Sequence, residues 1–269
     1  MLAYVEELDS SVRWNDEQNR AGAASKGWKD RAKVGVDRVA RQGKDICAPG
    51  RTALARSLRC ECVRENCSMA ADALKPSRDL SAVKRAARRC RACPLWENAT
   101  QTVFGEGPDD ARIVFIGEQA GDQEDRSGRP FVGPAGGLLD KALEEVGIDR
   151  ERVYVTNVIK HFKFELRGKR RIHQRADARE IAACLQWLER ELDRLQPRLV
   201  VCLGAMAARV MLGKTFGLMR QRGTWIERAP GQWCLATVHP AYVLRNRADF
   251  DAAYAAFVAD LKQLAHPPR

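Results

Sequence analysis

The sequence predicts an α/β fold, a three-layer sandwich in which helices cover both faces of a central, mostly parallel sheet of four strands. Two observations lead to this prediction. Apolar runs typical of strands alternate with amphipathic helical stretches from residue 77 onward. The apolar runs contain few polar positions, as expected for strands buried on both faces of a parallel sheet. We therefore assign residues 77–269 to one domain.

The first half of this domain supplies two helices and two strands. The predicted elements are a helix over 79–90, a strand over 112–117, a helix over 136–147 and a strand over 152–159. Ser77 or Asp79 is the expected N-cap of the first helix, and Gly147 ends the second. The two strands are short apolar runs, and the second is rich in β-branched residues.

The second half repeats the alternation. The predicted elements are a helix over 176–196, a strand over 199–204, a helix over 205–213, a strand over 234–239 and a closing helix over 249–265. The first of these is the longest helix, and Pro197 stands directly after it. Four strands separated by helices predict parallel neighbours, since the connections between them are long enough to cross over the sheet.

Residues 1–76 differ in composition from the rest of the chain. They are rich in Arg, Lys, Ala and Ser and show no sustained helical or alternating pattern. We interpret them as a weakly structured, basic N-terminal extension; a misplaced start codon would give the same appearance. Cys60, Cys62 and Cys67 lie here, and unligated thiols are a better interpretation of them than a second metal site.

The composition narrows the class of protein. Of 269 residues, 45% are hydrophobic and 30% charged, which suits a soluble globular protein. The formal net charge of +11 favours a polyanionic partner, with nucleic acid as the first candidate, although ribosome-associated or membrane-surface proteins share this balance. Acidic residues near the N-terminus and the absence of a long apolar run predict neither signal peptide nor membrane span, hence a cytoplasmic protein.

Polar residues stand at or just beyond the ends of three predicted strands. They are Glu118, Gln119, Asn157 and His239. Parallel sheets bind ligands beyond the carboxyl ends of their strands, so these side chains are expected to share one edge. Three of the four histidines in the chain, His161, His173 and His239, are predicted close to the same edge.

Residues 160–175 combine many cations with two aromatic rings. The basic residues are Lys160, Lys163, Lys169, Arg167, Arg170, Arg171 and Arg175, and the rings are Phe162 and Phe164. Basic side chains neutralise phosphates and aromatic rings stack on bases, so this loop is a candidate nucleic-acid contact. A solvated charged loop is the plainer interpretation; the position of the segment on the ligand side of the sheet favours the contact.

Nine cysteines in a reducing compartment favour metal binding over disulfides. Cys90 and Cys93 form a C-x2-C pair at the end of a predicted helix, where a metal or cluster site is a better interpretation than a redox dithiol. Two further ligands are then required, and Cys184 with His161 would supply them. Cys202 and Cys234 lie in apolar strands and are expected to be buried structural thiols.

Five segments in order resemble the family 4 uracil-DNA glycosylases, and most of all their UdgX branch. The segments are CRACPLWENATQTVFGEGP at 90–108, IGEQAGDQEDRSGRPFVGPAGGLLDKAL at 116–143, VTNVIKHFKF at 155–164, GKRRIH at 168–173 and HPAYVLR at 239–245. The likeness covers residues 80–265. It implies a protein that flips uracil out of DNA and cleaves its N-glycosidic bond.

The resemblance assigns roles to the residues of the site. It implies that Gly117 and Gly121 let the backbone approach the nucleotide, and that Glu118, Gln119 and Asp122 lie beside the scissile bond. It further implies that Phe131 stacks on the flipped base, that Asn157 recognises the uracil edge and that His239 donates to uracil O2. Leu244 and Arg245 would enter the DNA where the base has left.

The GKRRIH segment resembles the UdgX branch in particular. There the loop places an imidazole where water would attack, which implies a covalent bond between His173 and the deoxyribose C1′. Lys169, Arg170 and Arg171 would hold this loop on phosphates. The resemblance also implies a structural [4Fe–4S] cluster on Cys90, Cys93, His161 and Cys184. The sequence departs from the branch at Ala120, where proline is usual, and at 241–243.

These implications predict a monomer that acts on uracil-containing DNA, single strands included, and has no membrane partner. Two alternatives remain at this point. The same site would release both uracil and abasic DNA if water attacked instead of His173. A non-catalytic nucleic-acid-binding module with a structural zinc would share the charge and the cysteines.

Overall fold

The computed structural model describes residues 79–268. The predicted N-terminal extension over 1–76, with Cys60, Cys62 and Cys67, lies outside the described residues, so the prediction for it is untested. Among the residues described, no helix combines the length and the apolar character needed to cross a membrane.

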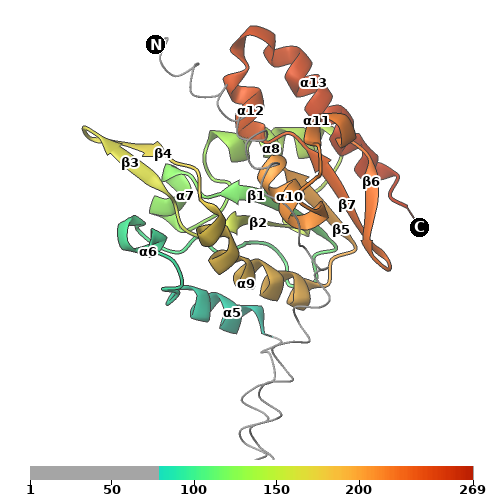
Figure 1. Cartoon of the computed structure of the whole chain (residues 1–269). Helices are drawn as coiled ribbons and strands as arrows, with labels where there is room; N and C mark the ends of the chain where they lie inside the picture. Colours follow the sequence, from blue (N-terminus) through green and yellow to red (C-terminus); the bar gives the residue numbers. More distant parts are fainter. Residues whose placement is uncertain (1–78, 269) are drawn as a thin grey trace, which may run out of the picture. The chain divides into compact units, whose positions relative to one another are not determined.

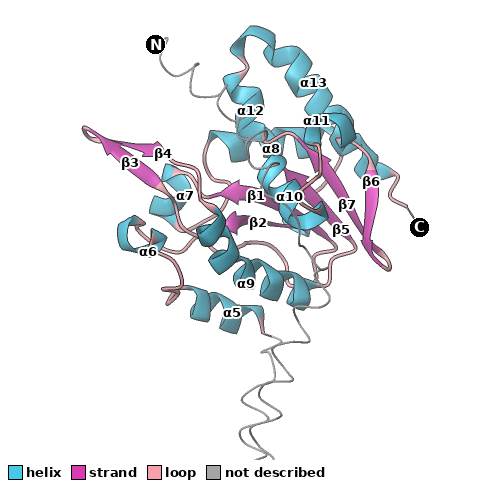
Figure 2. Ribbon diagram, in the orientation of Figure 1, coloured by secondary structure: helices cyan, strands magenta, loops and turns pink. Residues whose placement is uncertain are grey.

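The central sheet contains five strands in the order β2-β1-β5-β7-β6 (Figure 2). The strands are β1 (Ile113–Gln119), β2 (Val153–Ile159), β5 (Leu199–Leu203), β6 (Trp225–Ala229) and β7 (Gln232–Thr237). The four predicted strands are β1, β2, β5 and β7, and all their pairings are parallel. The mostly parallel sheet is therefore confirmed.

The fifth strand, β6, was not predicted. It runs antiparallel to β7 at the edge of the sheet, and the two are joined by a turn through Gly231, whose φ is +76°. Its sequence WIERA has no fully buried position, because an edge strand shares only part of its surface with the core. This short strand has Glu227 and Arg228 near its centre. It therefore lacks the continuous apolar run from which the other four strands were predicted.

Helices cover both faces of the sheet, which confirms the three-layer sandwich. The helices of eight or more residues are α5 (Leu80–Ala87), α8 (Pro134–Glu145), α9 (Ala178–Leu195), α10 (Ala205–Leu212) and α13 (Phe250–Leu261). They match the five predicted helices to within a few residues. Asp79, one of the two expected caps, accepts a hydrogen bond from the Ser81 N–H at 2.9 Å.

Two separate cores result from this layering. On one face α5, α9 and α10 pack on alternate strand residues such as Val114 and Val200. On the other, α8 and α13 pack on the intervening residues, such as Phe115 and Val201. Each strand therefore contributes successive side chains to opposite cores, and this explains why the strands contain almost no polar positions.

The remaining elements are short. They are α6 (Leu95–Asn98), α7 (Asp122–Ser127), α11 (Leu218–Gln221), α12 (Pro240–Arg245) and the 3₁₀ turns η2 (Arg150–Arg152), η3 (Arg247–Asp249) and η4 (Lys262–Ala265). A separate two-stranded hairpin consists of β3 (Phe164–Arg167) and β4 (Arg170–His173). It projects from the body beside α7 (Figure 1).

The β3–β4 hairpin occupies the basic segment that was predicted to be a loop. Its turn contains Gly168, whose φ of +62° suits a tight two-residue hairpin connection. Charged residues fill half of its strand positions, so no continuous apolar run marks it as a strand. Cross-strand pairing and contacts with the body stabilise it instead.

Candidate active site

The candidate site lies at the carboxyl ends of β1 and β2, where both strands point toward α7 and the hairpin (Figure 1). Gly117 and Asn157 are direct neighbours in the parallel register. A Cβ atom on Gly117 would lie 2.3 Å from Asn157 Oδ1 and 2.7 Å from Phe131 Cζ. The missing side chain thus makes room for the Asn157 amide and the Phe131 ring to meet above β1.

Phe131 is held in an unusual backbone conformation. Its φ is +57°, in the left-handed region that a bulky residue avoids, although the residue is buried. Close packing of α8 enforces this conformation, because a Cβ on Gly136 would lie 1.7 Å from the Phe131 carbonyl oxygen. Such strain costs on the order of 1–3 kcal/mol and is typical of binding sites. It directs the Phe131 ring toward Gly117.

The buried carboxylate of Glu124 joins the two loops of the site, and sequence reasoning missed it. It accepts hydrogen bonds from the Gly121 N–H at 3.0 Å and from the Gly133 N–H at 2.8 Å. Gly121 precedes α7 and Gly133 precedes α8, so one side chain fixes both helix starts. A glutamate three residues after a helix-starting glycine was the available signal.

His239 is the N-cap of α12 at the end of β7. Its Nδ1 accepts the Ala241 N–H at 3.1 Å, so the ring proton resides on Nε2. Burial, helped by the charge of Arg245, lowers the pKa of His239 to about 4. The ring lies 6.2 Å from the Phe131 ring at an angle of 24°. His239 is therefore a neutral imidazole with an available N–H donor.

His173 ends β4 on the exposed side of the hairpin. Its ring centroid lies 6.0 Å from that of Phe162. Desolvation first, then the charges of Arg245 and Arg175, lower its pKa below the ordinary value for histidine. The imidazole is therefore uncharged at neutral pH and retains a free lone pair.

Glu118 follows Gly117 on β1 and is half-buried. Burial raises the pKa of its carboxyl group, and the cations of Arg175 and Arg245 oppose that shift. The same two arginines also act on His173. The structure thus gathers Glu118, His173 and the two arginines around one edge of the sheet.

Gln119 holds the hairpin rather than standing free in the site. Its Nε2 donates to the carbonyl oxygens of Lys163 at 3.3 Å and Gln174 at 3.0 Å, which bracket the hairpin. Its Oε1 atom is buried and has no hydrogen-bond partner within residues 79–268. The side chain predicted to lie beside a scissile bond therefore sets the position of the element that carries His173.

Arg171 is turned inward, although it was expected to bind phosphate. Its guanidinium donates to the carboxylates of Asp122 and Asp125, the latter at 2.6 Å. It also lies over the rings of Phe162 at 5.5 Å and Phe164 at 5.0 Å, and the side chain is only 12% exposed. Arg171 and Asp122 thus form an ion pair with each other, and their predicted roles as a DNA contact and as a residue beside the scissile bond stay predictions.

Two lysines of the basic segment also have internal partners. Lys160 is 1% exposed, and its Nζ donates to Glu191 Oε2 at 2.5 Å and to the Asn157 carbonyl oxygen at 2.8 Å. Lys163 pairs with Glu180 at 2.8 Å. Both carboxylates come from α9, 31 and 17 residues further along the chain. Lys169, Arg170 and Arg175 remain exposed.

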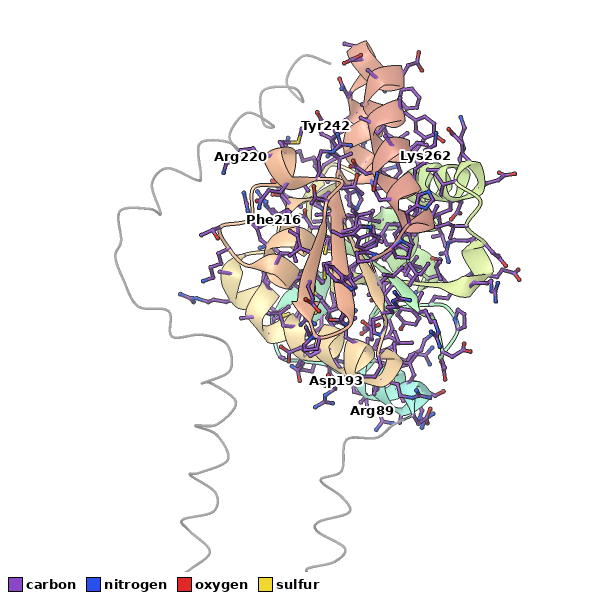
Figure 3. The ribbon with its side chains drawn as sticks, turned by 90° about the vertical axis from the view of Figure 1, so that its right-hand side faces the viewer. Arg89, Asp193, Phe216, Arg220, Tyr242 and Lys262 are labelled. Carbon is purple, nitrogen blue, oxygen red and sulfur yellow. The ribbon has the colours of Figure 1, made fainter. Side chains whose placement is uncertain are left out.

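The two residues predicted to enter the DNA, Leu244 and Arg245, differ in their exposure on the short helix α12. Leu244 packs partly against the core on the α8 side, whereas Arg245 is exposed. Tyr242, which Figure 3 labels, lies three residues before Arg245 and so on the same helical face. Its side chain is 44% exposed. Tyr242 is therefore the large apolar side chain that this helix exposes, and the predicted entry of Leu244 and Arg245 into DNA stays a prediction.

The four predicted metal ligands occupy neighbouring elements but form no complete site. Cys90 and Cys93 are half-buried after α5, whereas His161 and Cys184 are buried. Burial raises the pKa of the Cys184 thiol to about 11. Within the described part of the chain, no three His, Cys, Asp or Glu side chains are placed to hold a metal ion. Cys202 and Cys234 are buried, as predicted.

Comparison with known proteins gives one family. The family model described as "Uracil DNA glycosylase superfamily" matches residues 104–262, well over half of the chain. A type-4 uracil-DNA glycosylase of Thermotoga maritima is 40% identical over 168 residues, which are 62% of this chain and 84% of the relative.

Two archaeal proteins extend this comparison. A type-4 uracil-DNA glycosylase of Archaeoglobus fulgidus is 36% identical over 176 residues, covering 61% of this chain and 83% of the relative. A type-5 uracil-DNA glycosylase of Pyrobaculum aerophilum is 28% identical over 164 residues, covering 54% of this chain and 68% of the relative. The residues matched by the family model, 104–262, include all five strands of the sheet and the residues of the candidate site from Gly117 to Arg245.

Proposed function

This chain belongs to the uracil DNA glycosylase superfamily, and from that premise we propose that it excises uracil from DNA and becomes bonded to the resulting sugar through His173, as in the UdgX branch. One observation carries the proposal most directly: His173 is an exposed imidazole with a lowered pKa on a hairpin that the Gln119 amide joins to the end of β1, the strand that contains Gly117. DNA containing uracil, single strands included, is the proposed partner of a monomeric protein.

Recognition of uracil is assigned to the buried Asn157 amide. Its oxygen and its NH2 group match the N3–H donor and the O4 acceptor of uracil, whereas cytosine presents the reverse pattern. Phe131 would lie against the face of the base. The close contacts across Gly117 support this assignment, because they bring the amide and the ring to one point.

Replacing Gly117 by alanine is expected to lower uracil excision by about 100-fold. The new Cβ would lie 2.3 Å from Asn157 Oδ1 and must displace the amide, and a shift on the order of 1 Å in a reacting group costs about that factor. The matched control is Gly137→Ala in α8, where a Cβ meets nothing within 4 Å. Uracil release is measured by chromatography; equal rates for the two variants would contradict the assignment.

The leaving uracil carries negative charge, and His239 is proposed to stabilise it. A neutral imidazole whose Nδ1 is occupied by the Ala241 N–H offers Nε2–H as a donor to uracil O2. Its lowered pKa supports hydrogen bonding rather than proton transfer. Glu118, opposite, would stabilise the positive charge that develops on the sugar.

The bond-forming step then uses His173 as the nucleophile. The C1′–N1 bond breaks and its electron pair leaves with uracil, while the lone pair of one His173 ring nitrogen bonds to C1′. The proton on the other ring nitrogen passes to solvent, and the uracil anion takes up a proton. Lys169, Arg170 and Arg245 are exposed around the site and would contact phosphates.

A denaturing gel tests this function. The protein is incubated with a uracil-containing single-stranded oligonucleotide and with its thymine counterpart. We expect a shifted band that survives heat and detergent with uracil only. A free strand that alkali cleaves would instead indicate attack by water, which Glu118 would orient. An unchanged strand would indicate a binding module.

The family's [4Fe–4S] cluster is proposed on the predicted ligands, Cys90, Cys93, Cys184 and His161. Three thiols and a neutral imidazole are donors suited to iron, and burial lowers the pKa of His161. Its Nε2 lies 2.9 Å from the Thr102 hydroxyl, which in turn donates to the Ala87 carbonyl, so Nδ1 is left to ligate. The cluster would cross-link α5, β2 and α9; iron and sulfide assays after anaerobic purification test it.

A further inference from the structure

We propose that the tip of the β3–β4 hairpin forms a second DNA contact, in which the Leu166 side chain wedges against a base next to the excised uracil. The inference rests on the proposed function and extends it from the reacting nucleotide to its neighbour. The tip consists of Leu166, Arg167, Gly168, Lys169 and Arg170.

Leu166 is the exposed apolar residue of this tip. Its side chain is 64% exposed, although most large apolar side chains between residues 79 and 268 are buried. A single exposed leucine is ordinary on a protein surface and proves nothing by itself. Three features distinguish Leu166 from an ordinary exposed leucine. They are the direction of its side chain, the rigid support of the hairpin and the charged residues around it.

The register of the hairpin gives the direction. Phe164 pairs with His173, and Leu166 pairs with Arg171. Residues that oppose each other in an antiparallel pair project from the same face, as do residues two positions apart on one strand. Leu166 therefore projects from the face that carries His173, beyond the point where Arg171 meets α7.

The spacing matches the DNA strand. Two residues along a β-strand span about 7 Å, which equals roughly two 3.4 Å steps of a stacked strand. If His173 reaches C1′ of the target nucleotide, Leu166 is placed one or two nucleotides away. At that distance it meets a neighbouring base and not the uracil.

The hairpin is fixed where it leaves the body. Arg171 joins it to Asp122 and Asp125 of α7, and the Gln119 amide holds both ends of the hairpin. The rings of Phe162 and Phe164 stack with a centroid distance of 5.2 Å beneath the guanidinium. A side chain that displaces a nucleobase must be rigidly supported. The contacts where the hairpin joins the body supply that support.

The charges around Leu166 identify the partner as nucleic acid. Arg167, Lys169 and Arg170 are exposed beside it, and Lys169 stands in the turn. Arg167 lies 3.7 Å from the exposed Glu165 carboxylate, a surface pair that is weak enough to exchange for a phosphate. Proteins that insert an apolar side chain such as leucine between base steps also contact the nucleic acid through Arg and Lys side chains. A protein partner recognised through one leucine would not need three cations within five residues.

The test compares Leu166→Ala with Met219→Ala. Met219 on α11 is 66% exposed and lies outside the site, so it controls for the loss of an exposed apolar side chain. The full-length protein binds a single-stranded oligonucleotide in which 2′-fluoro-deoxyuridine resists cleavage and 2-aminopurine stands beside it. Fluorescence of the 2-aminopurine reports unstacking of the neighbouring base.

We expect Leu166→Ala to weaken binding about tenfold and to abolish the fluorescence change, because one base contact of this kind is lost. Leu166→Phe is expected to restore both, and Met219→Ala to change neither. Equal behaviour of the two alanine variants overturns the inference. Uracil release from an ordinary substrate is measured in parallel: its absence in the unmodified protein refutes the proposed function, whereas the binding comparison still decides the role of Leu166.

Discussion

Replacing His173 by alanine is expected to remove the covalent protein–DNA band entirely, a loss of at least about 1000-fold. His173 supplies the lone pair that bonds to C1′, and no other side chain of the hairpin face can replace it: Arg171 is charged and internally paired, and Phe164 has no nucleophilic atom. The measurement is the time course of the shifted band on a denaturing gel with a uracil-containing oligonucleotide.

The control is His266→Ala, which removes another exposed histidine, outside the site. It should form the band at the unmodified rate. Free uracil is quantified in the same reactions, because a His173→Ala protein that still releases uracil would show that water enters the vacated space. A band of normal intensity from that variant would rule out His173 as the point of attachment.

Replacing Lys160 by methionine is expected to lower the free energy of unfolding by about 3–5 kcal/mol. The change leaves the Glu191 carboxylate buried without a counter-charge. Its remaining donors are neutral: the Gly105 N–H at 2.9 Å, the Tyr154 hydroxyl at 3.0 Å and the Thr156 hydroxyl at 2.9 Å. Urea unfolding, followed by circular dichroism, measures the loss.

A double variant separates buried charge from lost packing. Lys160→Met combined with Glu191→Gln removes both charges and keeps an acceptor for the neutral donors, so it should be clearly more stable than Lys160→Met alone. Arg85→Met, which breaks an exposed pair with Asp79, is the surface comparison and should cost less than about 1 kcal/mol. If Lys160→Met were no more harmful than Arg85→Met, the buried pair would not stabilise the fold.

The central fold was predictable because its strands lie in an apolar interior. Strands buried on both faces leave an apolar run in the sequence, and this run identified β1, β2, β5 and β7. The convergence of Gly117, Asn157 and His239 followed from it, since parallel strands end at the same edge. The edge strand β6 and the β3–β4 hairpin have no such run and were missed.

The ion pairs between residues far apart in the chain could not be predicted from local sequence. Arg171 looks like a phosphate ligand until α7 places Asp122 and Asp125 against it, 49 and 46 residues earlier in the chain. Lys160 likewise looks like a surface cation until Glu191 is found beside it. A basic run shows how many cations exist, but the fold determines which of them reach solvent.

The Asp125 carboxylate accepts one more pair of hydrogen bonds, and they connect the hairpin with the segment that follows Cys93. Besides the Arg171 guanidinium, it accepts the Thr100 N–H at 3.0 and 3.1 Å, and Thr100 follows the Cys90–Cys93 segment by only a few residues. The hairpin and the segment that follows Cys93 are therefore both hydrogen-bonded to the same buried carboxylate, that of Asp125. Loss of the Asp125 carboxylate would therefore leave the Thr100 N–H and the Arg171 guanidinium each without this acceptor, which would weaken the attachment of the Cys93–Thr100 segment and of the hairpin that carries His173.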